Sequence, residues 1–173
     1  MISEIRNNQT VQILKFCLNK VIQDIYITGW TEILAEYHYF STMGWWYYVK
    51  FDDFLICLSS DTTKGMLSVD IHQKIKCNFE IEDDDKFTVM RINNINQGHY
   101  DGWIITDIEL FFGNYYTQEP AAVGFQCRDF SGGFERKTYI FFDAMKLNGI
   151  EIGNEKDMEL FLQDTRHYFE KLI

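Results

Sequence analysis

Histidine and cysteine are the side chains best suited to acid–base or nucleophilic chemistry, and here they form no recognisable motif. The histidines are scattered at positions 38, 72, 99 and 167, and none lies near a cysteine at zinc-ligand spacing. His99 and Asp101 could form an acid–base pair, but a surface loop running into a strand explains them as well. The sequence lacks phosphate-binding glycine loops and the HExxH and GxSxG motifs. We therefore expect no catalytic residue, no cofactor, no metal site and no enzymatic turnover.

Carboxylates are concentrated in two predicted turns. Between Glu80 and Asp85, five of six residues are acidic, but the segment lacks the spacing and the glycine of an EF-hand calcium loop. The cluster could contact a basic protein, or it could be a solvated hairpin tip whose charges prevent edge aggregation. Adjacent aspartates also form a second turn. The candidate partner-binding carboxylates are Glu82, Asp83, Asp84, Asp85, Asp52 and Asp53.

Aromatic residues offer a second kind of contact. The run from Trp45 to Tyr48 has the strand-forming composition of a protein-interface anchor, although alternation lets only about half of it face one way. Either Trp45 and Tyr47 or Trp46 and Tyr48 would then fill the core. The candidate aromatic contacts are Trp45, Trp46, Tyr115 and Tyr116.

Apolar periodicity predicts helices at both ends of the chain. Apolar residues recur at helical spacing from Val11 to Ile25, with Gly29 as a stop, and a second piece could span Thr31 to Phe40. Asn154 is a good N-cap, and an apolar stripe follows it as far as Leu172.

Between these helices the pattern is that of antiparallel strands. The clearest signal is Val69–Ile81, which alternates apolar and polar residues and predicts burial of Ile71, Ile75, Cys77, Phe79 and Ile81. Lys74, Lys76 and Glu80 should then be exposed. The other predicted strands are Trp45–Val49, Phe54–Leu58, Phe87–Arg91, Ile104–Phe112, and a hairpin of Val123–Phe130 with Phe134–Phe142.

The expected fold class is therefore α+β, within a single domain spanning residues 1–173. A central antiparallel, curved β-sheet would carry an N-terminal helix and a C-terminal helix packed on its apolar faces. No stretch is apolar enough to cross a membrane, and the first residues lack the apolar run of a signal peptide. The four cysteines form no CxxC pair, so we expect buried, reduced thiols in a cytoplasmic protein.

The charge balance bears on possible partners. The chain has 16 basic and 26 acidic side chains, a formal charge of −10, and nearly all of the excess lies after residue 40. Such a surface repels phosphate backbones, so nucleic-acid binding is disfavoured. It would attract a basic partner, although acidity also serves solubility alone.

In type, the chain resembles the immunity proteins of bacterial polymorphic-toxin and contact-dependent inhibition systems. The resemblance rests on the short acidic chain, on Asn- and Ile-rich usage, and on strands such as Trp103–Leu110 without catalytic residues. The ending Tyr139–Asp143, then Leu147–Ile152, then a helix, is also similar. No diagnostic motif accompanies it. The resemblance implies an acidic antitoxin that occludes a cognate basic toxin domain, often a nuclease.

Two alternatives remain open. A helix-plus-curved-sheet enzyme or small-molecule binder, resembling the nuclear-transport-factor-like cone fold, would have a deep pocket holding a polar group of perturbed pKa. A structural or adaptor domain would instead have a large, flat apolar patch.

Overall fold

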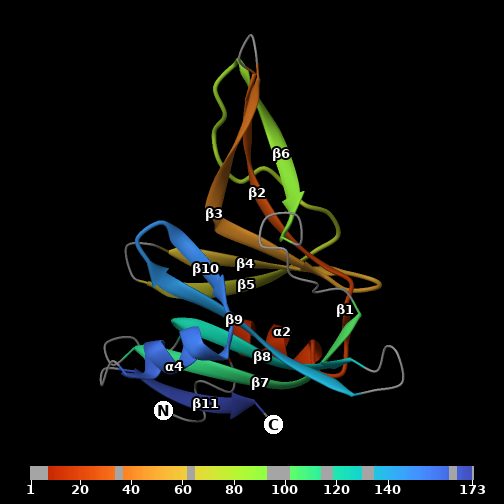
Figure 1. Cartoon of the computed structure of the whole chain (residues 1–173), viewed down its shortest axis with the longest axis vertical. Helices are drawn as coiled ribbons and strands as arrows, with labels where there is room; N and C mark the ends of the chain where they lie inside the picture. Colours follow the sequence, from red (N-terminus) through yellow and green to blue (C-terminus); the bar gives the residue numbers. More distant parts are fainter. Residues whose placement is uncertain are drawn as a thin grey trace.

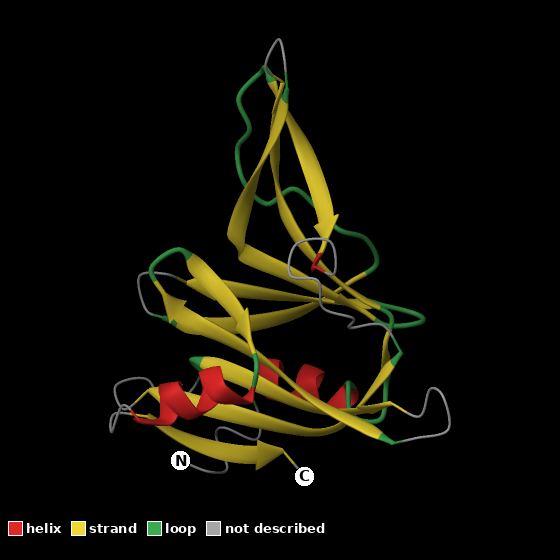
Figure 2. Cartoon of the chain, viewed as in Figure 1, coloured by secondary structure: helices red, strands yellow, loops and turns green. Residues whose placement is uncertain are grey.

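The computed structural model describes residues 8–33, 37–61, 65–92, 102–113, 119–129, 135–163 and 167–172. Within them lie two helices and eleven strands, and every strand pairing is antiparallel (Figure 2). The elements in chain order are α2 (Gln9–Phe16), β1 (Val21–Ile22), β2 (Asp24–Ile33), β3 (His38–Lys50), β4 (Leu55–Asp61), β5 (Met66–His72), β6 (Asp85–Arg91), β7 (Trp103–Gly113), β8 (Ala122–Asp129), β9 (Arg136–Lys146), β10 (Gly149–Gly153), α4 (Glu155–Gln163) and β11 (His167–Leu172).

The strands form two sheets rather than one central sheet, and the α+β class is confirmed. Sheet A has the order β1-β7-β8-β9-β10, with β11 also paired to β7, and sheet B has the order β5-β4-β3-β2-β6. In Figure 1 the far halves of β2 and β3 rise with β6 away from the body. We call this projection, residues 28–33, 38–43 and 85–91, the arm. A register shift between Ile27 and Thr28 marks its base, where a bulge bends the paired strands.

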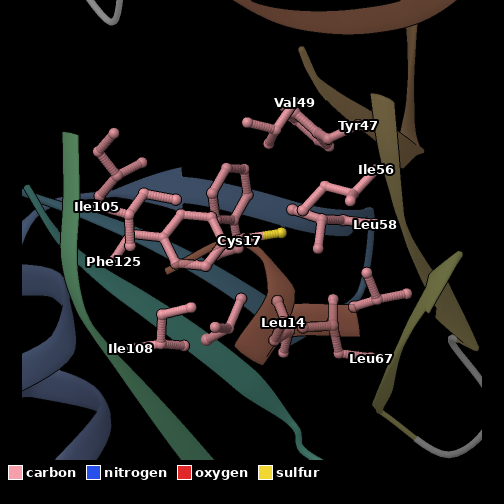
Figure 3. Close-up of a cluster of buried hydrophobic side chains, with 14 of the residues drawn as sticks. Leu14, Cys17, Tyr47, Val49, Ile56, Leu58, Leu67, Ile105, Ile108 and Phe125 are labelled. Atoms are coloured by element: carbon pink, nitrogen blue, oxygen red, sulfur yellow. The ribbon is translucent and has the colours of Figure 1, made fainter. Parts of the chain in front are cut away.

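The main core lies between the two sheets and is closed by α2 (Figure 3). Sheet B contributes Val49, Ile56 and Leu58, all fully buried. Burial of each such side chain stabilises the fold by roughly 1.5–3 kcal/mol. The facing side chains are Leu14 of α2, Cys17 at its C-cap, and Ile105, Ile108 and Phe125 from sheet A.

Helix α2 is shorter than the apolar spacing predicts. It begins where the Asn8 side chain accepts a hydrogen bond from the Thr10 amide at 2.8 Å, and it ends at Phe16. Asn19 has a φ of 63°, a left-handed conformation that stops a helix. The apolar residues beyond it stay in the core as strand β1, in which Ile22 pairs with Trp103.

The helix predicted from Thr31 to Phe40 is wrong, because the described residues of this segment belong to the β2–β3 hairpin. Thr31 pairs with Phe40 and Ile33 with His38. β-Branched and aromatic residues favour strands, and β6 supplies a further partner on the other side of β2. Two apolar residues of that predicted helix, Ile33 and Tyr37, are exposed, with 57% and 61% of their surface in solvent.

The strand predicted over Val69–Ile81 is confirmed only as far as His72. Residues 73–84 instead run without strand pairing over the outer face of sheet B, and we call them the strap. Ile71 and Cys77 are exposed, and Ile75, Phe79 and Ile81 are only half-buried, so their predicted full burial is wrong. The expected exposure of Lys74, Lys76 and Glu80 is confirmed.

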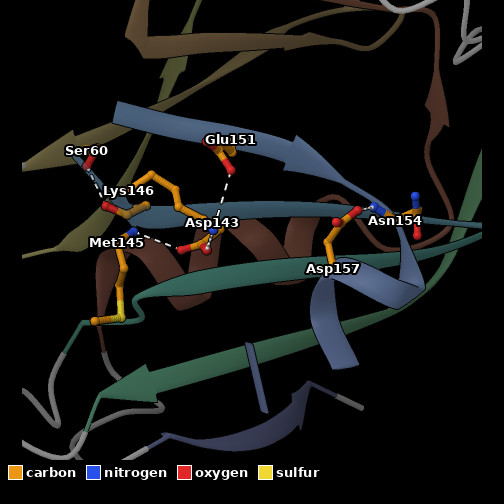
Figure 4. Close-up of polar contacts among 8 residues, drawn as sticks. Ser60, Asp143, Met145, Lys146, Glu151, Asn154 and Asp157 are labelled. Atoms are coloured by element: carbon orange, nitrogen blue, oxygen red, sulfur yellow. Dashed lines mark hydrogen bonds and ion pairs between the residues drawn. The ribbon is translucent and has the colours of Figure 1, made fainter. Parts of the chain in front are cut away.

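The C-terminal helix also ends early, at Gln163. Its predicted start is confirmed: Asn154 Oδ1 accepts a hydrogen bond from the Lys156 amide at 2.9 Å, and Asp157 accepts one from the Asn154 amide (Figure 4). The predicted helix beyond this point is wrong, because residues 167–172 form β11. Since β1 pairs only with Trp103 and Ile104 of β7, the edge from Ile108 to Gly113 is available to β11.

Candidate functional site

Acidic side chains gather around a groove of about 560 Å³ at the end of the arm. Strand pairing sets Glu32 directly opposite Asp85. Glu80, Glu82 and Asp84 approach from the strap and line the same groove. Three of the four carboxylates predicted in this turn therefore line one groove together with residues that are distant from them in sequence. Asp83 is exposed in the same turn.

The carboxylates at this groove repel one another. The pKa of Asp85 is raised by desolvation and by the negative charges of Glu32, Glu82 and Asp84. A cation brought to this position would relieve that repulsion. The site is therefore electrostatically suited to lysine or arginine side chains of a partner.

Exposed aromatic side chains lie beside these carboxylates. Tyr37 and Tyr39 have 61% and 57% of their surface in solvent, and Tyr39 pairs directly with Glu32 across the hairpin. The sequence does not identify this pair, because the apolar spacing predicts a helix over their segment. Aromatic residues favour strands, so the aromatic composition of this segment was the available signal for a hairpin.

Asp52 and Asp53, the second predicted acidic turn, are exposed between β3 and β4. Asp52 accepts a hydrogen bond from the Gln23 side chain. The turn lies near Asp24, at the end of β2 opposite Glu32. At the rise of an extended strand the two acidic regions are roughly 25 Å apart. They do not form one continuous surface.

Of the predicted aromatic contacts, Trp45 remains partly exposed and Trp46 is largely covered. Their rings are 5.9 Å apart, and Trp46 also stacks on the strap residue Phe79, with ring centroids 5.9 Å apart. Tyr47 lies in the main core and Tyr48 beneath the strap, so both faces of this strand bury an aromatic residue. Tyr115 and Tyr116 lie outside the described residues, as do His99 and Asp101.

A second groove, of about 740 Å³, lies on the outer face of sheet A beside the start of α4. Its floor carries Glu109, which is only 7% exposed. The Tyr139 hydroxyl donates a hydrogen bond to Glu109 Oε2 at 2.7 Å, and Gln126 Nε2 donates one to Oε1 at 3.0 Å. The three side chains come from β7, β8 and β9, so the sheet itself holds them in place.

Gly124 makes this arrangement possible. It lies on β8 between Glu109 of β7 and the neighbouring strand β9. A Cβ atom at Gly124 would lie 1.8 Å from the Tyr139 hydroxyl oxygen. The tyrosine therefore crosses over β8 because glycine leaves room for it.

The environment of Tyr139 disfavours its ionised form. Burial raises the pKa of Tyr139, and so do its hydrogen bond to Glu109 and the negative charges of Glu109, Glu155 and Asp107. The groove thus contains a polar group of perturbed pKa, the feature expected of a small-molecule binder.

The thiols are free, and most are buried. Burial raises the pKa of Cys17 and Cys127 to about 12 and that of Cys57 to about 11, which suppresses the reactive thiolate. Cys77 is the exception, since it is exposed on the strap.

Among the described residues, no cluster of histidine, cysteine or acidic side chains could hold a metal ion. No helix in the described part of the chain has the length and apolarity needed to cross a membrane.

Comparison with known proteins gives no family for this chain. No family matches the sequence, and no curated protein or solved structure shows significant similarity to it.

Proposed function

We propose that this protein is a cytoplasmic binding protein that neutralises a basic toxin domain, such as a nuclease, by occluding its active site. The acidic end of the arm is the proposed contact surface. The observation that carries the proposal is the gathering of Glu32, Glu80, Glu82, Asp84 and Asp85 around one groove beside two exposed tyrosines.

Each part of this surface has a physical role in binding. The carboxylates steer a basic partner and pair with its lysine and arginine side chains. Tyr37 and Tyr39 supply rigid apolar area at low entropic cost, the usual property of interface anchors. The protein itself needs no catalytic group for this function, since occlusion alone inhibits the toxin.

The test uses a basic toxin domain recovered with this protein by pull-down from its native host, and an arm variant in which Asp83, Asp84 and Asp85 are all replaced by Asn. We expect the variant to lose protection in a toxin-challenged cell while keeping the thermal melting temperature of the parent. A matched variant with Asp52→Asn and Asp53→Asn, at the far end of β2, should still protect. Full protection by the arm variant would contradict the proposed surface, and loss only in the second variant would move the contact to the β3–β4 turn.

The groove on sheet A favours small-molecule binding as a second candidate function. It holds a buried carboxylate and a tyrosine of raised pKa in a volume typical of ligand sites. At this groove the raised pKa of Tyr139 keeps its hydroxyl protonated and therefore a poor nucleophile, so we propose binding rather than turnover.

A further inference from the structure

Strand β6 forms one edge of sheet B and one side of the arm (Figure 1). All seven of its residues pair with β2, and among the described residues no strand pairs with its other side. An edge strand of this kind presents backbone N–H and C=O groups to which a further strand can bind. The arm can therefore accept one more strand at this edge.

Few of the features that usually block a sheet edge are present in β6. The strand contains no proline, its pairing with β2 has no register shift, and its residues 87–90 carry no charge. A groove of about 400 Å³ lies beside it, lined by the four consecutive residues 86–89. Consecutive side chains point to opposite faces of a sheet, so a groove lined by all four follows the edge of the strand rather than one face.

The sequence of β6 is complementary to itself in the antiparallel direction. When Thr88 is set opposite Thr88 of a second copy, the ring of Phe87 lies opposite the β-branched Val89 of that copy. Cross-strand pairs of an aromatic and a β-branched residue stabilise a sheet. In the same register Lys86 lies opposite Met90, against which the apolar stem of the lysine can pack. The centre of the strand therefore matches a second copy of itself.

The two ends of β6 carry opposite charges. With Thr88 at the centre, Asp85 lies opposite Arg91 of the second copy, and two-fold symmetry makes this pair occur twice. Three other carboxylates of the arm repel the Asp85 carboxylate, so a cation at this position is favourable. The Arg91 side chain is 48% exposed while it holds its ion pair with Asp24, and Asp85 of the second copy would join that existing pair.

We propose that a second copy of this chain binds at β6, through antiparallel pairing of the two β6 strands about Thr88. The two arms then share one continuous sheet, to which each copy contributes the five strands of its sheet B. The contact is symmetric, because the same surface of each copy binds the other. It does not depend on a toxin, and Thr88 does not line the acidic groove, so its failure would leave the proposed toxin contact unaffected.

The experiment measures the mass of the full chain by sedimentation equilibrium over a concentration series. Physiological ionic strength is used, because salt then screens the repulsion between two acidic copies. We expect the parent protein to reach the mass of a dimer at the upper concentrations. Thr88→Lys sets two ammonium groups opposite each other, so it should raise the dissociation constant of the dimer at least about tenfold.

Thr42→Lys is the matched control. Thr42 pairs with Gly29 from the β3 side of the arm, as Thr88 pairs with the same glycine from the β6 side. The control therefore adds the same charge to the same face of the arm, but at the opposite edge. It should leave the dissociation constant unchanged.

Cross-linking keeps the test decisive if Thr88→Lys does not fold. Residues opposite each other on antiparallel strands have Cα atoms about 4.5–5.5 Å apart, a separation that suits a disulfide bond. The background is Cys77→Ser, which removes the exposed thiol. On oxidation with diamide, Thr88→Cys should give a covalent dimer and Thr42→Cys should not.

A parent protein that stays monomeric at every concentration would overturn the proposal. Equal weakening by the two lysine variants, or equal cross-linking of the two cysteine variants, would also overturn it.

Discussion

At the scale of single residues, Gly124 determines whether Tyr139 can reach Glu109. Replacing Gly124 by Ala puts a methyl group where the tyrosine ring now lies. We expect a loss of about 1–3 kcal/mol in the free energy of unfolding, the usual effect of overpacking. Urea denaturation would measure it. In a Tyr139→Ala background the same glycine substitution should cost much less, and an equal cost there would mean that the crossing tyrosine is not the cause.

Tyr139 also predicts a dependence of stability on alkaline pH. Its pKa is raised in the folded protein by burial, by the hydrogen bond to Glu109 and by nearby carboxylates. In the unfolded chain a tyrosine ionises at about pH 10. Above that pH the unfolded state binds fewer protons than the folded state, so the contribution of Tyr139 to stability is lost as pH rises.

The measurement is the free energy of unfolding of the parent and of Tyr139→Phe between about pH 8 and 11. The parent should lose stability more steeply above about pH 10 than the variant, because phenylalanine does not titrate. Parallel curves would contradict the raised pKa. Other tyrosines and lysines titrate equally in both proteins and cancel in the difference.

At the scale of elements, the strap depends on a few contacts with sheet B. Phe79 contacts Trp30, Trp46 and Phe87, and Asn78 donates a hydrogen bond to the Tyr48 hydroxyl at 3.0 Å. Because Phe79 is half-buried, Phe79→Ala should cost about 1–3 kcal/mol rather than the roughly 3–5 kcal/mol of a core phenylalanine. Chemical denaturation checks this value. Lys74→Ala, exposed on the same strap, should have almost no effect, and equal losses would argue against a specific role for Phe79.

The strap also illustrates what sequence could and could not predict. Local alternation correctly gave β5 up to His72, together with the antiparallel class and the start of α4. It could not show that the chain would leave sheet B there, because pairing depends on partners distant in sequence. The edge of β5 is occupied by such partners: the Leu67 amide donates to Pro120 O at 2.7 Å, and the Val69 amide donates to Thr10 Oγ1 at 3.3 Å.

The same limit applies to the candidate sites. The acidic turn was visible as adjacent carboxylates, but Glu32 joins it only through pairing of β2 with β6. The groove on sheet A was not predicted, since Glu109 and Tyr139 are 30 positions apart and meet across an intervening strand. Gly124 within a strand-like segment was the available signal, because an interior strand glycine often marks a close approach.

At the scale of the whole molecule, the two candidate sites lie on different parts of the fold. The acidic groove is at the end of the arm, and Figure 1 shows the arm projecting from sheet B. The second groove is on the outer face of sheet A. A partner on the arm would therefore leave the second groove accessible. Substitutions in one site should not change binding at the other, which allows each proposal to be tested separately.

The net charge of −10 makes a prediction about binding kinetics. Long-range attraction accelerates the encounter of an acidic protein with a basic one, and dissolved salt screens it over about 8 Å at physiological strength. The association rate with a basic toxin domain should fall steeply between low and physiological salt, while the dissociation rate changes less. Stopped-flow measurement at several salt concentrations would show this.

The arm variant shows whether the acidity acts locally or through the whole surface. If the carboxylates beside Glu32 and Asp85 dominate steering, replacing Asp83, Asp84 and Asp85 by Asn should slow association and flatten its salt dependence. The paired change Asp52→Asn and Asp53→Asn removes charge roughly 25 Å away at strand rise and should have a smaller effect. The alternative result is that each variant reduces the salt dependence of the association rate only in proportion to the number of charges removed, wherever they are removed. That result would mean that the net charge steers the partner. In that case the specific contacts would lie with Tyr37 and Tyr39.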